Sequence, residues 1–240
     1  MKSDAKSTIE TGKAILGIEL GSTRIKAVLI DQENKPIAQG NHTWENQLVD
    51  GLWTYSIEAI WSGLQDCYAD LRSNVKNLYG IEIENLAAIG VSAMMHGYMP
   101  FNAKEEILVP FRTWRNTNTG RAAAALSDLF VYNIPLRWSI SHLYQAILDN
   151  EAHVKDIDFL TTLAGYVHWQ LTGEKVLGIG DASGMLPIDP TTHNYSAEMV
   201  AKFDKLIAPN QYNWTLQDIL PKVLSAGESA GVLTPEGRKK

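Results

Sequence analysis

The sequence has only one cysteine, Cys67, and no long apolar run. A single thiol cannot form a disulfide within the chain, which excludes the class of small disulfide-stabilised secreted domains and leads us to expect a reducing, cytoplasmic compartment. No stretch reaches the about 18 apolar residues of a membrane-spanning helix, and the first thirteen residues, MKSDAKSTIETGK, lack the apolar segment of a secretory signal. We therefore expect neither a membrane anchor nor export.

Positive charge is also scarce. The chain has 21 Lys and Arg against 27 Asp and Glu, a formal net charge of -6, so it has no overall electrostatic attraction for nucleic acid or for an anionic membrane. Small molecules or other proteins are the partners that we expect. The 240 residues are 45% hydrophobic, which is enough for a substantial buried core.

Several common catalytic motifs are absent as well. The only Gly-Lys pair, Gly12-Lys13, lacks the upstream glycine and the following Ser or Thr of a Walker A loop. The sequence contains no HExxH zinc motif, no Cys/His cluster, no G-x-S-x-G turn and no dinucleotide fingerprint. Zinc hydrolases, serine hydrolases and nicotinamide enzymes therefore have no motif support.

Hydrophobic periodicity organises the first half of the chain. Residues 1–13 are polar and lack a period, so we expect a flexible tail there. Three- and four-residue apolar steps predict a long helix between Ser56 as N-cap and Gly80 as its end, and the apolar run Leu86–Ser92 predicts a buried strand. Alternating apolar residues predict three earlier strands, Ala14–Leu20, Arg24–Ile30 and Ile37–Thr43.

The second half is richer in helical patterns. We expect Thr119 and Ser141 to cap two helices and a third helix to end at Gly173, while the stretches YMPFN and ILVPF resemble a hairpin. Consecutive strands, then a helix, then a further strand predict an α/β domain with a mixed sheet flanked by helices.

The turn Gly21-Ser22-Thr23 between the first two strands suits an anion. Small residues there leave backbone amides exposed beside two hydroxyl groups, and Lys26 follows on the second strand, so phosphate is the favoured ligand. Glu19 precedes the turn and is a candidate ligand for Mg²⁺. The alternative is an ordinary hairpin turn beside a solvated Glu19–Lys26 pair.

Two further segments are candidates for binding a small molecule. SAMMHG follows a predicted strand and offers His96 beside the permissive Gly97, and FRTWRNTNT offers the apolar face of Trp114 beside Arg115 and Asn116. In each segment, ordinary core packing is the alternative.

The loop GIGDASGML is the third candidate. Its glycines surround Asp181 and Ser183, so Asp181 either binds a hydroxyl group of a ligand or caps the loop through its own backbone.

Several of these segments, taken in order, resemble the FGGY family of carbohydrate kinases, and most closely its xylulose kinase group. GIELGSTRIKAVLID is similar to the family's first phosphate loop, and AIGVSAMMHGYMPFN to its sugar-binding Met-His-Gly segment. GLWTYSIEAIW resembles the start of its first long helix, and LTGE followed by DASGM resembles another ordered pair. The resemblance extends over roughly Ala14 to Thr234.

The resemblance implies a ribonuclease H-like fold of the actin-like ATPase and sugar kinase type, with ATP and Mg²⁺ as cofactors. It implies that residues 14–234 are the N-terminal, sugar-binding lobe and that 235–240 begin the link to a C-terminal lobe. Gly21, Ser22, Thr23 and Lys26 would bind ATP phosphates; Met95, His96, Gly97, Trp114 and Asp181 would lie at the sugar; Glu19 would hold the metal.

Two departures from the family pattern matter. The family has Asp at the position of Glu19, so the metal role carries over with a longer side chain. The family's catalytic aspartate lies in the C-terminal lobe, beyond the point that matches Lys240, so we expect the chain to be inactive without that lobe. The C-terminal lobe is therefore an expected partner, and a homodimer is another.

The implied reaction is ATP-dependent phosphorylation of a sugar hydroxyl, with a ketopentose such as xylulose or ribulose as the expected substrate. Glycerol or polyol kinases are the alternative within the family, although they have an Arg-Glu pair where this chain has Met95-His96. Outside it, the alternatives are an actin- or chaperone-type ATP-binding module and a ribonuclease H-like nuclease. The nuclease needs several clustered carboxylates for two metals.

Overall fold

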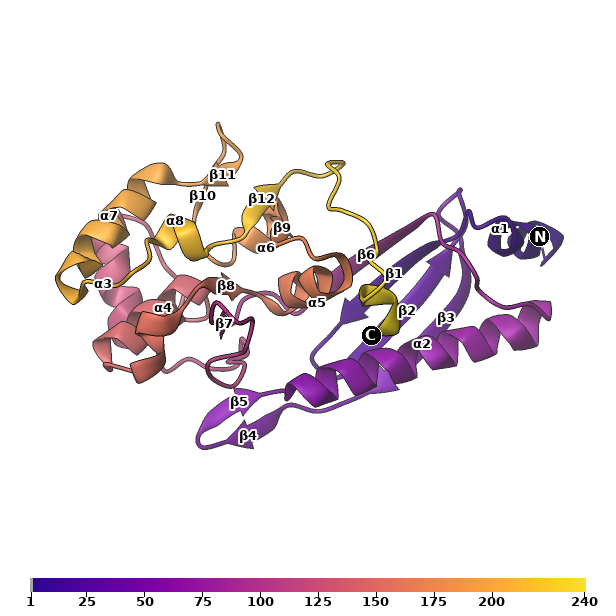
Figure 1. The fold of residues 1–240 in the computed structure, drawn as a ribbon, viewed down its shortest axis with the longest axis horizontal. Coiled ribbons are helices and arrows are strands. Elements are labelled where there is room, and N and C mark those ends of the chain that lie inside the picture. The colour runs from indigo at the N-terminus through magenta and orange to yellow at the C-terminus, as the bar shows by residue number, and fades with distance from the viewer. Residues whose placement is uncertain (1) are drawn as a thin grey trace. The chain divides into compact units, whose positions relative to one another are not determined.

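The computed structural model describes residues 2–240, which fall into two compact units (Figure 1). Unit 1 holds the chain up to Asn46, together with Tyr55–Met94 and Lys240. Unit 2 holds Gln47–Thr54 and Met95–Lys239. The sequence predicts one lobe over residues 14–234, whereas the contacts divide that stretch between the two units.

Unit 1 is built on a four-stranded mixed sheet, as predicted. The strand order is β3-β2-β1-β6, with β1 antiparallel to β2 and parallel to β6. The bounds are β1 (Ile15–Leu20), β2 (Arg24–Ile30), β3 (Pro36–Thr43) and β6 (Ala88–Ala93). The period-two pattern for β1, β2 and β3 and the apolar run for β6 therefore predict all four strands to within about two residues.

Helix α2 (Ile57–Tyr79) covers one face of this sheet, over β2 and β3 (Figure 1). Ser56 caps the helix by accepting from the amide of Ala59, and Gly80 ends it in the left-handed conformation, so both predicted caps are confirmed. The helix lies so close to β3 that a Cβ on Gly40 would be 2.3 Å from the carbonyl oxygen of Cys67. Only glycine fits between strand and helix at that point.

Two predictions in unit 1 are wrong. The expected flexible tail contains helix α1 (Lys2–Glu10), because Ala5 and Ile9, one helical turn apart, are both buried; Met1 lies outside the described residues. Strand β6 is an exposed edge strand rather than a buried one. Helix α2 packs on the strands at the other edge of the sheet, which leaves β6 uncovered.

Unit 2 is built around a large hydrophobic core. Its members include Tyr98, Leu126, Leu143 and Phe203, all fully buried, and helices α3, α4 and α7 contribute to it. The elements of unit 2 are β4 (Gln47–Val49), β5 (Leu52–Thr54), β7 (Met99–Phe101), α3 (Gly120–Phe130), α4 (Ser139–Leu148), η1 (Ala152–Asp156), β8 (Phe159–Thr161), α5 (Leu163–Thr172), β9 (Val176–Gly178), α6 (Ile179–Ala182), β10 (Ile188–Asp189), β11 (Asn194–Tyr195), α7 (Ala197–Ile207), η2 (Ala208–Asn210), α8 (Leu216–Ile219), β12 (Lys222–Leu224) and η3 (Gly237–Lys239).

The predictions for unit 2 are partly confirmed. Helix α3 begins after Thr119 and α5 ends at Gly173, as expected, although the Thr119 side chain donates to the Leu136 carbonyl and does not cap α3. Helix α4 begins at Ser139 after Trp138 rather than at Ser141. The expected hairpin is reduced to isolated bridges, because β7 pairs along its length with β8, a strand from far along the chain.

None of the helices formed by residues 2–240 is long and apolar enough to cross a bilayer.

Candidate functional site

In the predicted phosphate turn of unit 1, all three backbone carbonyl groups accept hydrogen bonds from Trp44 or Tyr55. The indole Nε1 of Trp44 donates to the carbonyl of Gly21 at 2.7 Å, and the Tyr55 hydroxyl donates to the carbonyl of Ser22 at 2.5 Å. The backbone amide of Trp44 donates to the carbonyl of Thr23 at 3.2 Å. The rings of Trp44 and Tyr55 stack with centroids 4.1 Å apart, so one aromatic pair fixes all three carbonyls.

The amides of the same turn are differently placed. The Gly21 amide donates to the carbonyl of Arg24 at 3.0 Å, whereas the amides of Ser22 and Thr23 have no hydrogen-bond partner within residues 2–240. A turn whose three carbonyls are all bound, while the amides of Ser22 and Thr23 are open, presents positive backbone dipoles to its surroundings. This geometry fits phosphate oxygens.

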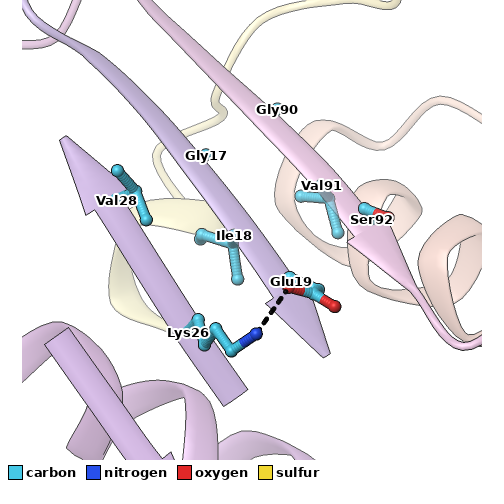
Figure 2. Close-up of a pocket in the computed structure, with 8 residues that line it drawn as sticks. All are labelled: Gly17, Ile18, Glu19, Lys26, Val28, Gly90, Val91 and Ser92. Atoms are coloured by element: carbon cyan, nitrogen blue, oxygen red, sulfur yellow. Dashed lines mark hydrogen bonds and ion pairs between the residues drawn. The ribbon is translucent and has the colours of Figure 1, made fainter. Parts of the chain in front are cut away.

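Glu19 and Lys26 lie on neighbouring strands at a shallow hollow in the sheet face (Figure 2). They are directly opposite in the β1–β2 register, and Lys26 Nζ is 3.3 Å from Glu19 Oε2. The hollow has a volume of ≈ 430 Å³, and its other lining residues are Gly17, Ile18, Val28, Gly90, Val91 and Ser92. The cross-strand pair that the sequence leaves open as an alternative is therefore present.

A metal ion held by protein side chains alone has no site in the described part of the chain. No group of three or more His, Cys, Asp or Glu side chains converges within residues 2–240. Magnesium often takes one or two carboxylates and completes its shell with phosphates and water. Glu19 fits that requirement only as a single carboxylate ligand of a nucleotide-bound Mg²⁺.

The predicted sugar segment of unit 2 has an unusual backbone. His96 and Gly97 have φ values of 71° and 96°, both in the left-handed region. A Cβ on Gly97 would be 2.7 Å from the carbonyl oxygen of Arg112, so glycine is required there. A non-glycine residue at positive φ costs free energy, and such residues concentrate at binding sites.

Neighbouring elements fix this strained segment. Ser139 Oγ donates to the Gly97 carbonyl at 2.6 Å, and the Gly97 amide donates to the carbonyl of Arg137 at 3.4 Å. His96 Nδ1 lies 3.4 Å from the carbonyl oxygen of Gly184, in the predicted third segment. Burial lowers the pKa of His96 below its ordinary value, so the ring is neutral at pH 7. Met95 remains 43% exposed and is free to contact a ligand.

Trp114 is paired with Arg137, a residue that the sequence does not single out. The guanidinium carbon of Arg137 lies 5.3 Å from the centre of the Trp114 ring, and its charge further lowers the pKa of His96. Arg137, an exposed cation of unit 2, thus interacts with both the Trp114 ring and the His96 imidazole. A basic residue just before the start of α4 is the only sequence signal for Arg137.

Arg115 and Asn116 do not accompany Trp114. The Arg115 guanidinium stacks 3.6 Å from the ring centre of Trp53 in β5. Asn116 accepts from the Trp53 amide at 2.9 Å and donates to the Trp53 carbonyl at 2.8 Å. Both residues therefore hold the β4–β5 hairpin rather than a ligand.

Asp181 is largely buried and bound on one side. Its Oδ2 accepts from Thr162 Oγ1 at 2.6 Å, and Thr162 caps α5 by accepting from the amide of Gly165. Its Oδ1 is buried and has no partner among residues 2–240, and burial raises the pKa of the carboxyl. These contacts anchor Asp181 to the start of α5, which differs from the cap through its own backbone that the sequence suggests.

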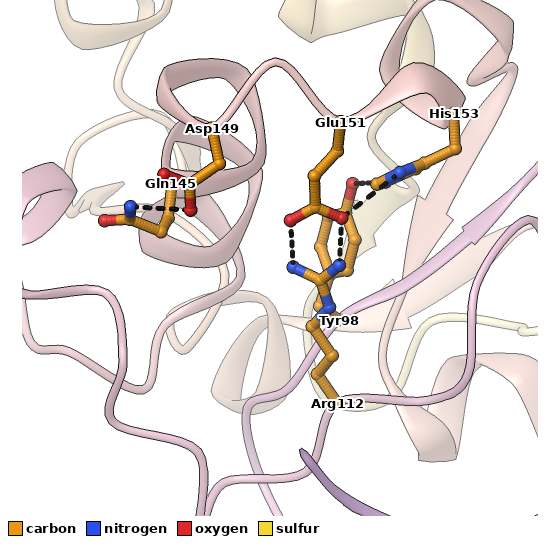
Figure 3. A network of polar contacts seen from close by, with 6 residues as sticks. All are labelled: Tyr98, Arg112, Gln145, Asp149, Glu151 and His153. Carbon is orange, nitrogen blue, oxygen red and sulfur yellow. Dashed lines mark hydrogen bonds and ion pairs between the residues drawn. The ribbon is translucent and has the colours of Figure 1, made fainter. Parts of the chain in front are cut away.

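A largely buried polar network joins Tyr98, two residues after His96 in the chain, to Arg112, two residues before Trp114 (Figure 3). Tyr98 OH and His153 Nε2 are 2.8 Å apart, and His153 Nδ1 is 3.5 Å from Glu151 Oε2. Arg112 forms a two-pronged pair with Glu151, and its guanidinium lies 5.2 Å from the centre of the Tyr98 ring. This network restrains the backbone that follows His96 and Gly97.

Comparisons with known proteins show the family and the fold of the chain. The description "FGGY family of carbohydrate kinases, N-terminal domain" matches residues 14–240. The chain is similar to the xylulose kinases of Escherichia coli (strain K12), at 20% identity over 93% of this chain and 45% of the relative, and of Haemophilus influenzae, at 22% identity over 92% and 46%.

Solved structures show the same fold. The chain superposes on the ligand-bound xylulose kinase from Lactobacillus acidophilus with a TM-score of 0.77, 18% identity and coverage of 94% of this chain and 45% of that one. For the Plasmodium falciparum glycerol kinase with ADP the TM-score is 0.71, with 16% identity and coverage of 93% and 45%. The chain thus spans about half the length of these relatives. It belongs to the FGGY family of carbohydrate kinases.

Proposed function

We propose that this chain is the sugar-binding and first phosphate-binding part of an ATP-dependent kinase that phosphorylates a hydroxyl group of an open-chain ketopentose such as xylulose or ribulose. The relatives that are 20–22% identical to the chain are named xylulose kinases, and they supply the substrate class. The observation that carries the proposal is the left-handed pair His96-Gly97, held by three neighbouring backbone and side-chain contacts. Strain of this kind is retained where it positions a ligand.

The sugar contacts that we assign are Met95, His96 and Trp114, with Gly97 allowing close approach of the backbone. The neutral imidazole of His96 forms a hydrogen bond with a hydroxyl group, and the face of Trp114 covers the carbon chain of the sugar. Arg137 adds a donor beside both. Asp181 acts on the sugar only indirectly, through the loop that it anchors.

The nucleotide contacts that we assign are the amides of Ser22 and Thr23 together with the ammonium group of Lys26, while Gly21, whose amide is bound to the Arg24 carbonyl, allows the tight turn. Open amides and a lysine stabilise the negative charge on phosphate oxygens, which is what phosphoryl transfer mainly requires of the protein. Bound Mg²⁺ would neutralise part of that charge, and Glu19 would be its carboxylate ligand from this chain. In the free protein Glu19 is paired with Lys26 at 3.3 Å.

Activity also requires a catalytic base, which the family places in its C-terminal lobe. We therefore expect sugar binding but no sugar-dependent ATP turnover from the 240 residues alone, with a C-terminal lobe as the partner that completes the enzyme.

Isothermal titration of the 240-residue chain with D-xylulose, D-ribulose and glycerol tests the proposal. We expect binding of at least one ketopentose, weaker binding of glycerol, and loss of ketopentose binding in His96→Ala. A preference for glycerol would favour a polyol kinase, and ATP binding without any sugar binding would favour an ATP-binding module of the actin or chaperone type.

A further inference from the structure

The contact between His96 and Gly184 determines which nitrogen of the imidazole carries the proton. Nδ1 of His96 lies 3.4 Å from the carbonyl oxygen of Gly184. A backbone carbonyl only accepts hydrogen bonds, so the contact requires a proton on Nδ1. In a neutral imidazole the other nitrogen, Nε2, is then without a proton and carries a free lone pair.

We propose that the Gly184 carbonyl fixes His96 as the Nδ1–H tautomer, so that Nε2 is a hydrogen-bond acceptor for a hydroxyl group of the sugar. Gly184 is thereby a positioning residue, and the loop that contains it determines the hydrogen-bonding polarity of the site. The identity of the sugar rests on the proposed function; the tautomer and its dependence on Gly184 do not.

The loop holds the Gly184 carbonyl in a defined place. The Gly184 amide donates to the carbonyl of Asp181 at 2.9 Å, and the Asp181 carboxylate accepts from Thr162 at the start of α5. The Ser139 amide is a second donor to the Gly184 carbonyl, at 3.4 Å, and Ser139 Oγ holds Gly97. Ser139 therefore fixes both the Gly184 carbonyl, which accepts from His96, and the Gly97 backbone, which follows His96. This also gives the buried Asp181 a function.

Only glycine allows this contact at position 184. A Cβ added to Gly184 would be 2.5 Å from His96 Nδ1 and 3.0 Å from His96 Cε1, so Gly184→Ala must displace the ring. A Cβ added to Gly180, in the short helix α6 that precedes Gly184, would meet nothing within 4 Å. Neither glycine has a positive φ, so alanine is compatible with the backbone at both positions. The two substitutions form a matched pair.

Long-range ¹H–¹⁵N NMR on the histidine-labelled 240-residue chain tests the tautomer directly. We expect a protonated Nδ1 and an unprotonated Nε2 for His96, a large shift of its ring signals in Gly184→Ala, and wild-type signals in Gly180→Ala. Circular dichroism and the thermal midpoint of both variants check that they fold. An Nε2–H tautomer in the wild type, or equal ring shifts in both folded variants, would overturn the proposal.

Sugar affinity tests the acceptor role separately, with D-xylulose as the probe. We expect Gly184→Ala to bind about tenfold more weakly than Gly180→Ala, the effect of one lost hydrogen bond. His96→Gln places an amide oxygen near the position of Nε2, whereas His96→Asn reaches only the position of Nδ1, so Gln should retain more affinity. Asparagine tolerates the φ of 71° at position 96 better than glutamine does, so backbone strain alone would favour His96→Asn. A higher sugar affinity of His96→Asn than of His96→Gln would therefore contradict an acceptor at Nε2.

The two proposals fail in different ways. If D-xylulose does not bind to the wild-type chain, the proposed sugar is wrong, while the tautomer and the comparison of Gly184→Ala with Gly180→Ala still decide the role of Gly184. If D-xylulose binds and His96 is the Nε2–H tautomer, the proposed function is supported and the proposed role of Gly184 is wrong.

Discussion

Lys26 of β2 lies directly opposite Glu19 of β1, and its Nζ is 3.3 Å from Glu19 Oε2 (Figure 2). The two side chains are 48% and 54% exposed, so their attraction is screened and contributes at most about 1 kcal/mol to stability. A pair this weak separates readily when a stronger partner arrives. Phosphate for Lys26 and Mg²⁺ for Glu19 are such partners.

Replacing Lys26 should weaken phosphate binding without unfolding the protein. We expect Lys26→Ala to bind tripolyphosphate several-fold more weakly, because one full positive charge is lost beside the open amides of Ser22 and Thr23. Amide chemical shifts during a tripolyphosphate titration measure this. Lys35→Ala, at an exposed site after the same strand, is the matched control and should bind as the wild type does. Equal weakening in both variants would indicate a general charge effect.

Replacing Glu19 should remove the contribution of Mg²⁺. We expect Mg²⁺ to tighten tripolyphosphate binding to the wild type and to have little effect on binding to Glu19→Gln. In Glu19→Asp the carboxylate remains on a shorter side chain, so we expect an intermediate effect of Mg²⁺. The same titration with and without Mg²⁺ gives the three values. Unchanged Mg²⁺ dependence in Glu19→Gln would exclude Glu19 as a ligand.

The buried network of unit 2 should be worth far more than the surface pair (Figure 3). The Arg112 side chain is only 7% exposed, so Glu151→Gln leaves a buried guanidinium without a counter-charge. We expect the free energy of unfolding to fall by about 2 to 4 kcal/mol. Urea denaturation measures it, with Glu82→Gln as the control at the half-exposed pairs of Glu82 with Arg72 and Lys76, where solvent screening should make the loss far smaller.

How far the sequence predicts this fold depends on whether the information is local. The alternation of the apolar Ile25 and Ala27 with the charged Arg24 and Lys26 begins the pattern that predicts β2 to the residue. Ser56 and Gly80 predict both ends of α2. The exposure of β6 is not predictable in this way, because an apolar run becomes buried only if another element covers it. Helix α1 has too few apolar residues, chiefly Ala5 and Ile9, to show a period against its polar surroundings.

The candidate site follows the same rule. The turn at Gly21 and the His96-Gly97 segment are visible in the sequence because their residue types are unusual at the end of a strand. The contacts that give them their geometry join residues far apart: Tyr55 to Ser22 over 33 positions, and Gly184 to His96 over 88. Sequence spacing carries no signal for such pairs, so the supporting residues appear only in the structure.

Acid should destabilise unit 2 through His142. The side chain is 1% exposed, neither ring nitrogen has a partner within residues 2–240, and burial lowers the pKa of the imidazole to about 3. The unfolded chain takes up this proton near pH 6.5 and the folded one does not, so the stabilisation is complete above pH 6.5 and decreases as the pH falls towards about 3.

His142→Leu should remove that part of the acid sensitivity. Between pH 6.5 and 4 we expect the wild type to lose up to about 1.4 kcal/mol per pH unit more than the variant, the limit for one proton. Denaturation at several pH values measures the difference, with His193→Asn as an exposed control whose φ of 55° suits asparagine. Parallel pH profiles for the wild type and His142→Leu would show that His142 does not titrate on unfolding.

An NMR titration of the 240-residue chain with D-xylulose locates the sugar site residue by residue. We expect D-xylulose to shift the amide signals of Met95, His96, Gly97 and Trp114, no such shifts in His96→Ala, and smaller shifts with glycerol. A spectrum that D-xylulose and D-ribulose leave unchanged, or shifts confined to residues away from His96 and Trp114, would contradict the proposed sugar site.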